Sequence, residues 1–314
     1  MDIFSAKIRL ASILAGLAIA AIATGIILAV VRYVFGYSFS IAVVGIILLF
    51  VAVIDIAQWL FSPYMIGWMY HMTPLSTSDP SVQWIRESVE KVAALNNEKV
   101  PQVFIAEVNF PNAFAYGSPL TGKRMAITRG LLSTLNRDEI EAVIGHEIGH
   151  LKHHDAELLL AIGLIPMLVF YLGYALIFSG GRGRQNGSAF LVAIVLIVVS
   201  FVFNIIILGV NRLRETYADI NAATTVQKGA DNLQTALAKI AASTPSHRVR
   251  SRKTASGSVA SMLMIYNPEE GVPTDHHILV EKWRHMKVPV SASLFSDHPH
   301  PAKRIQVLER YRHP

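Results

Sequence analysis

Cysteine is absent from this sequence of 314 residues, and charged residues make up only 16% of it. Without cysteine, disulfides, thiol nucleophiles and thiolate metal ligands are excluded, so any zinc site must use histidine and carboxylate ligands. The redox compartment stays open, because a chain without cysteine tolerates either. The low charge content and a mean hydropathy of +0.42 are atypical of a soluble protein and predict a membrane protein.

Nucleic-acid-binding motifs are also lacking from the sequence, so we expect no nucleic-acid partner despite a net charge of +6. Positive charge instead suits contact with anionic lipid headgroups, and the lipid bilayer is the expected partner. Four uncharged stretches could each cross a hydrocarbon core about 30 Å thick, which predicts four transmembrane helices. They are residues 10–31, 37–54, 158–178 and 190–210. The first is too long for the apolar region of a signal peptide, so we expect it to remain as an anchor.

Aromatic and polar residues near these stretches predict where the membrane ends. Asp55 is interpreted as a solvated residue at the membrane edge, and Asn204 as an interhelical hydrogen-bonding group. The alternatives are a functional ionisable group within a span for Asp55 and a ligand for Asn204. The aromatic residues after the second span are interpreted as a belt at the level of the headgroups: Trp59, Tyr64, Trp68 and Tyr70.

A metal-binding pattern lies between the second and third spans. His146 and His150 stand four residues apart with Glu147 between them. Positions i and i+4 share one face of a helix, so both imidazoles can bind one metal ion beside the Glu147 carboxylate. This is the H-E-x-x-H arrangement of zinc proteases. Asn136 and Glu139 predict a reciprocal N-cap for the helix that carries it.

The motif helix is expected to continue directly into the third span, because His150 is only eight residues before Leu158. At 1.5 Å per residue the motif would lie about 12 Å from the membrane. His153 and His154 are therefore expected at the headgroups and not at the metal.

A second pair of candidate residues follows the fourth span. Glu215 and Asp219 are four residues apart, and a carboxylate on a second helix would complete a His₂Glu zinc site. Glu215 is the predicted third ligand, and Asp219 would accept the outer N–H of a ligand imidazole. The alternative is a solvated acidic pair on an ordinary helix.

Short segments of strand character precede the motif helix, at residues 100–106, 112–116 and 124–128. Asn112, Ala113 and Phe114 could form an edge strand on which a peptide substrate adds as a further strand. A plain hairpin is the equally weighted alternative.

A mobile basic loop is expected at residues 243–258, and His298 lies in a turn bounded by prolines near the end of the sequence.

Four segments together resemble the M48 family of membrane zinc metalloproteases, and their order is similar to its HtpX branch. In the last segment the family usually has Thr and Pro where this chain has Asp297 and His300. The segments are HEIGHLKHHD at 146–155, RETYAD at 214–219, PNAF at 111–114 and FSDHPHPAKRI at 295–305.

The resemblance implies one zinc ion held by His146, His150 and Glu215, with Glu147 as the catalytic base. It implies a multi-pass protein of the cell membrane whose cytoplasmic catalytic domain cleaves misfolded or unassembled membrane proteins, and sensitivity to self-cleavage. The expected fold class is an α-helical membrane protein with an α+β zincin-like (gluzincin) catalytic domain and a small edge-strand sheet beside the motif helix. The expected domains are a membrane hairpin at 1–61, half of the catalytic domain at 62–157, a second hairpin at 158–210 and the other half at 211–314.

Basic residues that flank the spans also favour a cytoplasmic catalytic side. On the motif side lie Lys7, Arg9, Lys152, Arg212 and Arg214, against Arg32, Arg182 and Arg184 on the other.

The predicted reaction is metal-assisted peptide hydrolysis, with His298 or Tyr217 steadying the tetrahedral oxyanion. Two other classes of function are weighed against it. A catalytically silent zinc-binding scaffold or holdase would not need Glu147, and a zinc transporter would need ligand-type residues within its spans.

Overall fold

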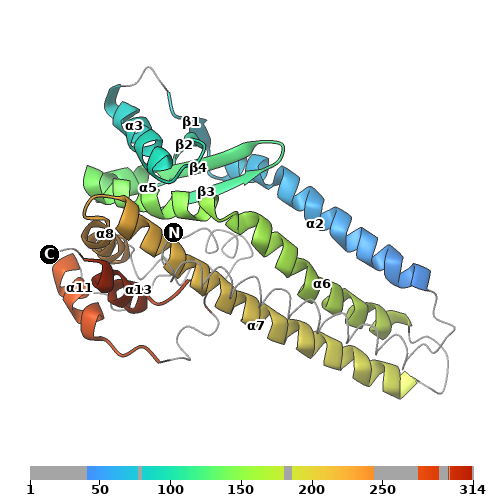
Figure 1. Ribbon diagram of the computed structural model, residues 1–314. Coiled ribbons are helices and arrows are strands. Elements are labelled where there is room, and N and C mark those ends of the chain that lie inside the picture. Colours follow the sequence, from blue (N-terminus) through green and yellow to red (C-terminus); the bar gives the residue numbers. More distant parts are fainter. Residues whose placement is uncertain are drawn as a thin grey trace. The chain divides into compact units, whose positions relative to one another are not determined.

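The computed structural model describes residues 41–76, 80–179, 186–243, 275–289, 296 and 298–312 (Figure 1). The chain divides into two compact units, each built from two separate segments. Unit 1 comprises Met1–Trp59 and Glu157–Asn211, and unit 2 comprises Leu60–Ala156 and Arg212–Pro314. The predicted first span, residues 10–31, and the basic loop from residue 244 onward lie outside the described residues.

Unit 1 contains α6 (Asp155–Ser179), most of α7 (Asn186–Thr225) and the first part of α2 (Ile41–Met69). By length and composition, two described helices could cross a membrane, over Asp155–Ile177 and Phe190–Thr225, where the third and fourth spans were predicted. They are joined by a buried apolar cluster: Val169, Leu172 and Leu176 of α6 with Ala193, Leu196 and Phe203 of α7.

Helix α2 does not end with the predicted second span but continues through Pro63 to Met69. Trp68 is 82% exposed near its end, as an interfacial residue would be, whereas Tyr70 is only 3% exposed. Tyr70 packs against Phe110 and Phe114 with ring centroids 6.0 and 5.3 Å away. The aromatic-belt prediction is therefore wrong for Tyr70, because this side chain belongs to the core of unit 2.

The sheet of unit 2 has four strands in the order β1-β2-β4-β3. Strands β2 (Gln102–Ala106), β3 (Ala113–Ser118) and β4 (Gly122–Thr128) lie close to where strands were predicted. Strand β1 (Met72–Pro74) was missed, since three residues are too few for an alternating pattern. Strands β2 and β4 are parallel, and the other pairs are antiparallel. In this order β3 lies at one edge of the sheet.

Helices cover this sheet and enclose the main core of unit 2, in which Ile85, Ile144 and Leu237 are fully buried. Helix α3 begins at a proline, which suits the first turn of a helix, and its apolar residues follow helical spacing. The helices are α3 (Pro80–Leu95), α4 (Arg129–Thr134), α5 (Arg137–Lys152), α8 (Gly229–Ser243), α11 (His276–His285) and α13 (Pro301–Leu308), with a 3₁₀ turn at Glu309–Tyr311.

The expectation that the motif helix runs unbroken into the third span is wrong. Helix α5 ends at Lys152, His154 has a left-handed backbone with φ of 53°, and α6 begins at Asp155. A left-handed residue cannot continue a right-handed helix. The break turns Asp155 back toward His150 of α5.

Candidate metal centre

Helix α5 is held firmly at its start and packed tightly along its length. Asn136 and Glu139 form the predicted capping box: each side chain accepts a hydrogen bond from the backbone N–H of the other residue. A Cβ atom on Gly145 would lie 2.7 Å from Val226 Cγ2, and one on Gly149 would lie 3.1 Å from Ala218 Cα. The two glycines therefore let α5 approach the C-terminal part of α7, which carries Glu215.

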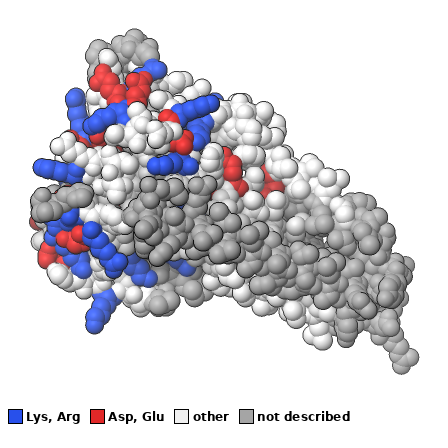
Figure 2. All heavy atoms as spheres, in the orientation of Figure 1, with Lys and Arg blue, Asp and Glu red and all other residues white. Residues whose placement is uncertain are grey.

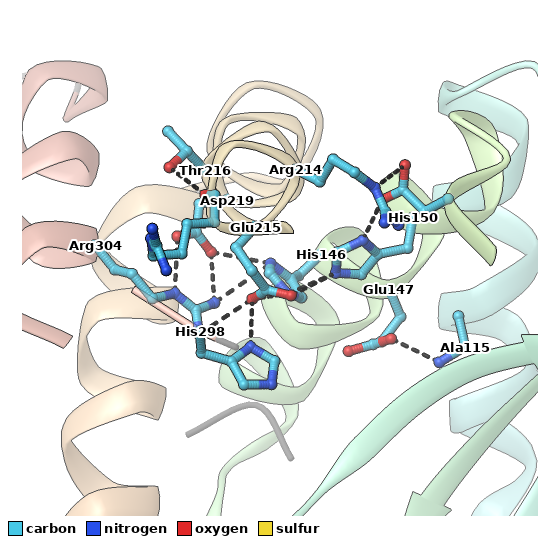
Figure 3. Close-up of polar contacts among 12 residues, drawn as sticks. Ala115, His146, Glu147, His150, Arg214, Glu215, Thr216, Asp219, His298 and Arg304 are labelled. Atoms are coloured by element: carbon cyan, nitrogen blue, oxygen red, sulfur yellow. Dashed lines mark hydrogen bonds and ion pairs between the residues drawn. The ribbon is translucent and has the colours of Figure 1, made fainter. Parts of the chain in front are cut away.

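This close approach brings His146, His150 and Glu215 together in unit 2, with one potential ligand atom of each within 4.8 Å of the others (Figure 3). The two Nε2 atoms are 3.2 Å apart. Glu215 Oε2 lies 3.6 Å from His146 Nε2, and Oε1 lies 3.4 Å from His150 Nε2. Two imidazoles and one carboxylate are the donor set of many catalytic zinc sites, so these residues fit a zinc ion.

Each of the two histidines is bound on its other nitrogen by a carboxylate. Asp219 Oδ1 lies 2.9 Å from His146 Nδ1, and Asp155 Oδ2 lies 2.6 Å from His150 Nδ1. A carboxylate at Nδ1 keeps the proton there and leaves Nε2 to bind a metal. Asp219 was expected in this position, whereas Asp155 was not. On a continuous helix Asp155 would be turned about 140° from His150, and only the break at His154 brings the two together.

Two arginines that sequence reasoning missed hold these carboxylates. Arg304 of α13 is 2% exposed and binds both oxygens of Asp219 at 2.8 and 2.6 Å. Arg214 Nε lies 2.8 Å from Asp155 Oδ1. Charge balance was the available signal, because buried carboxylates require cations nearby, but sequence spacing does not say which cation.

Electrostatic surroundings favour an ionised ligand carboxylate. Burial acts to raise the pKa of Glu215, but the nearby His298 and His150 rings lower that pKa well below its usual value. Burial also raises the pKa of Glu147, an effect that His146 and His150 only partly oppose. The carboxyl groups of Glu147 and Glu215 thus differ in proton affinity.

Glu147 also connects the helix to the edge of the sheet. Its Oε2 atom accepts a 2.7 Å hydrogen bond from the backbone N–H of Ala115 in β3. Backbone groups of successive residues point to opposite sides of a strand, so Ala113, two residues from Ala115, faces the same edge as Ala115. Asn112 does not: its N–H donates to Thr128 Oγ1 and its carbonyl accepts from Thr128 N. Of the residues predicted for the substrate edge, Ala113 is the one whose backbone is directed outward.

The structure separates the two candidates for the oxyanion. His298 is buried and its Nδ1 lies 3.0 Å from Glu215 Oε2, while its Nε2 has no hydrogen-bond partner in the described parts of the chain. Tyr217 instead packs edge-on against His153, with ring centroids 3.8 Å apart. It lies about 200° around α7 from Glu215 and so faces away from the cluster.

The cluster of histidines and carboxylates on two helices beside a sheet edge defines a metallopeptidase site. A family model for peptidase family M48 matches residues 79–312, and the chain belongs to this family. It is 52% identical to a "Protease HtpX homolog" of Picrophilus torridus and 50% identical to one of Thermoplasma acidophilum, with 99% of both chains covered in each comparison.

A solved structure supports the fold alone. The crystal structure of Ste24p from S. mikatae matches 96% of this chain and 66% of that chain, with a TM-score of 0.56 and 19% identity. Together with the candidate spans, these relatives indicate a membrane metalloprotease whose substrates are polypeptides.

Proposed function

We propose that this M48 metallopeptidase is a zinc-dependent endopeptidase of misfolded or unassembled membrane proteins. The observation that carries the proposal is the group of His146, His150 and Glu215. Beside it lies Glu147, which accepts a hydrogen bond from the edge strand β3. The three residues of the group would hold the ion through Nε2, Nε2 and the carboxylate. Zinc, when bound, would lower the pKa of water and polarise a carbonyl group.

Glu147 would act as the general base. Its burial favours proton uptake, since a raised pKa makes a carboxylate a better proton acceptor. One of its oxygens is held by Ala115 N–H, which leaves the other to take a proton from water and pass it to the leaving amine. His298 Nε2, buried and without a described partner, would donate to the oxyanion.

Strand β3 would bind the substrate backbone. A peptide lying antiparallel to β3 could pair with the outward backbone groups of Ala113 and Ala115, close to Glu147. This refines the predicted edge of Asn112, Ala113 and Phe114, because Asn112 is already engaged with Thr128.

The substrate class and the orientation rest on the family resemblance and on the flanking charges. We place both segments of unit 2, Leu60–Ala156 and Arg212–Pro314, on the cytoplasmic side of the cell membrane. Val100 is 50% exposed in unit 2, so a Val100→Cys variant in this cysteine-free chain can test the orientation. An impermeant thiol reagent should label it only after cells are opened, and labelling in intact cells would reverse the orientation.

Replacement of Glu147 by Gln tests the base. The variant should keep its zinc and lose about 10²- to 10⁴-fold in cleavage of an unfolded polypeptide. Glu141→Gln on the same helix is the matched control, since Glu141 pairs with Lys91 on the surface. If the Glu147→Gln protein with bound zinc cleaved the polypeptide at the wild-type rate, Glu147 would be excluded as the base. Loss of zinc from that variant would show a ligand role instead.

A further inference from the structure

Unit 1 contains a groove in which polar side chains interrupt apolar walls. Its volume is about 400 Å³, and it is lined by Asp55 of α2, by Gly163 and Phe170 of α6, and by Ser200 and Asn204 of α7, among others. The α6 and α7 residues lie within the two candidate membrane spans. The groove therefore faces a hydrocarbon environment, where polar groups are costly and mark functional sites.

Among the residues that the structure describes, the groove offers hydrogen-bond acceptors without a matching cation. Within the described residues, the Asp55 carboxylate makes no ion pair or hydrogen bond, and no Lys, Arg or His lines the groove. Asn204 donates through Nδ2 to Ser200 O at 3.0 Å, which leaves its carbonyl oxygen unpaired in the same set of residues. A ligand with a positive charge would satisfy these acceptors, and the ring of Phe170 offers a cation–π surface nearby.

The depth of the groove argues for a polypeptide and against a lipid headgroup. Ser200 is ten residues from Phe190, so it lies about 15 Å along the span, near the middle of a hydrocarbon core about 30 Å thick. The α6 wall from Leu159 to Tyr171 extends about 18 Å, more than three helical turns. The groove also includes Leu159 near one end of the α6 span, so it runs from the membrane edge toward the middle. A phospholipid headgroup does not reach the Ser200 end, whereas a transmembrane helix passes along the whole groove.

A small residue makes room for such a helix. A Cβ atom built on Gly163 would meet nothing within 4 Å, so the backbone of α6 is open to close approach there. Small residues at this kind of position allow helices to associate in membranes.

We propose that this groove binds a membrane-spanning helix of a substrate that carries a lysine or arginine, which pairs with Asp55. The inference rests on the proposed proteolysis of membrane proteins and adds a basis for selecting among them. Basic residues in the spans of assembled membrane proteins are already paired with partner groups, whereas unassembled ones leave them exposed. A helix held in unit 1 also stays tethered to the chain that carries the metal centre, which raises its effective concentration there.

Disulfide trapping in the full-length, otherwise cysteine-free protein tests the groove directly. The Gly163→Cys variant is reconstituted in phosphatidylcholine vesicles with an apolar single-span peptide that carries a central Lys and a Cys one turn away. The Lys peptide should cross-link about tenfold more than its Lys→Leu counterpart, as expected for one charge pair. In the double variant Gly163→Cys/Asp55→Asn, both peptides should cross-link with the low yield of the Leu peptide.

The control for position is Val202→Cys, since Val202 is 48% exposed on α7 and does not line the groove. Its yield should not depend on the Lys. Equal cross-linking of the Lys and Leu peptides at Gly163→Cys, or a Lys preference that survives Asp55→Asn, would overturn the proposal. So would loss of cross-linking when phosphatidylethanolamine replaces phosphatidylcholine, because a lipid amine would then be the occupant.

Cleavage separates this inference from the proposed function. Asp55→Lys should transfer the preference in cleavage from a Lys-bearing span to a Glu-bearing one. If no substrate is cleaved by the wild type, the proposed function fails, and the cross-linking result still decides the groove. Preserved Lys preference in cleavage by Asp55→Lys would refute the role of Asp55.

Discussion

At the scale of single residues, both histidines of the metal centre are supported in the same way. A carboxylate binds each Nδ1 atom, and an arginine binds each carboxylate. Asp219 pairs with Arg304 (Figure 3), and Asp155 pairs with Arg214. These carboxylates are buried, and a buried charge that loses its partner is strongly destabilising. Lys and Arg elsewhere on the visible face of unit 2 lie on its surface beside Asp and Glu (Figure 2).

Arg304 can be tested with a conservative change. Arg304→Lys keeps the charge but cannot bind both oxygens of Asp219, so His146 should be less well oriented. We expect zinc affinity to fall by about 10- to 100-fold, measured by competition with a chelator of known affinity. Arg312→Lys, an exposed pair with Asp231, should leave the affinity unchanged. An unaltered affinity in Arg304→Lys would show that Arg304 serves stability alone.

Local pattern was enough to anticipate part of this residue set. Helical spacing places His146 and His150 on one face, and the same rule relates Glu215 to Asp219. Asp155 and Arg304 could not be anticipated, because their places depend on a helix break and on how α13 packs against α7. Arg214 was counted as a charge at the membrane edge, but it is buried against Asp155.

At the scale of elements, the distance between α5 and α7 sets the geometry of the centre. Gly149 is pressed against α7, with a Cβ position 3.1 Å from both Ala218 Cα and Asn221 Cβ. Asn221 also donates a 2.9 Å hydrogen bond to Gly145 O, which fixes the two helices in register. A side chain at position 149 would push His150 away from Glu215.

Gly149→Ala should therefore lower zinc affinity and destabilise unit 2 by about 1–3 kcal/mol, the usual range for overpacking. Gly163→Ala in α6 is the control, since its Cβ would meet open space, and it should be neutral or slightly stabilising. Thermal unfolding in detergent and zinc titration measure the two effects. If Gly149→Ala and Gly163→Ala had the same thermal stability and the same zinc affinity, close packing of α5 and α7 would not be required for metal binding.

The break between α5 and α6 can be tested at His154. Its left-handed backbone, with φ of 53°, costs an ordinary residue about 1–2 kcal/mol relative to glycine. His154→Gly should be neutral or stabilising, and His154→Val destabilising by about that amount, in thermal unfolding. Glu141→Gly, inside helix α5, should have the opposite sign to His154→Gly. Destabilisation by His154→Gly would show that the imidazole itself is needed.

The predicted elements differ in how far the sequence could define them. The capping box at Asn136 and the strands β2, β3 and β4 follow from local residue types. The end of α5 does not, since the segment HLKHHD at residues 150–155, where α5 ends, contains no glycine or proline of the kind that usually stops a helix. Tertiary contacts of Asp155 with His150 and Arg214 stabilise the break instead.

At the scale of the whole molecule, the metal centre joins two distant parts of the chain. His146 and His150 precede the candidate spans of α6 and α7, and Glu215 follows the apolar part of α7. Unit 2 is thus completed only after the chain has passed through unit 1. Composition predicted a membrane protein, and the paired motifs predicted which segments would meet.

The central claim is that the His146, His150 and Glu215 group binds a zinc ion on which proteolysis depends. The most direct measurement is cleavage of an unfolded polypeptide by the purified full-length protein, with zinc content determined in parallel. Chelation should remove about one zinc per chain and abolish cleavage, and added zinc should restore both. Undiminished cleavage by folded protein that contains no metal would contradict the account. So would the absence of cleavage by folded protein in which zinc is bound to all three ligands.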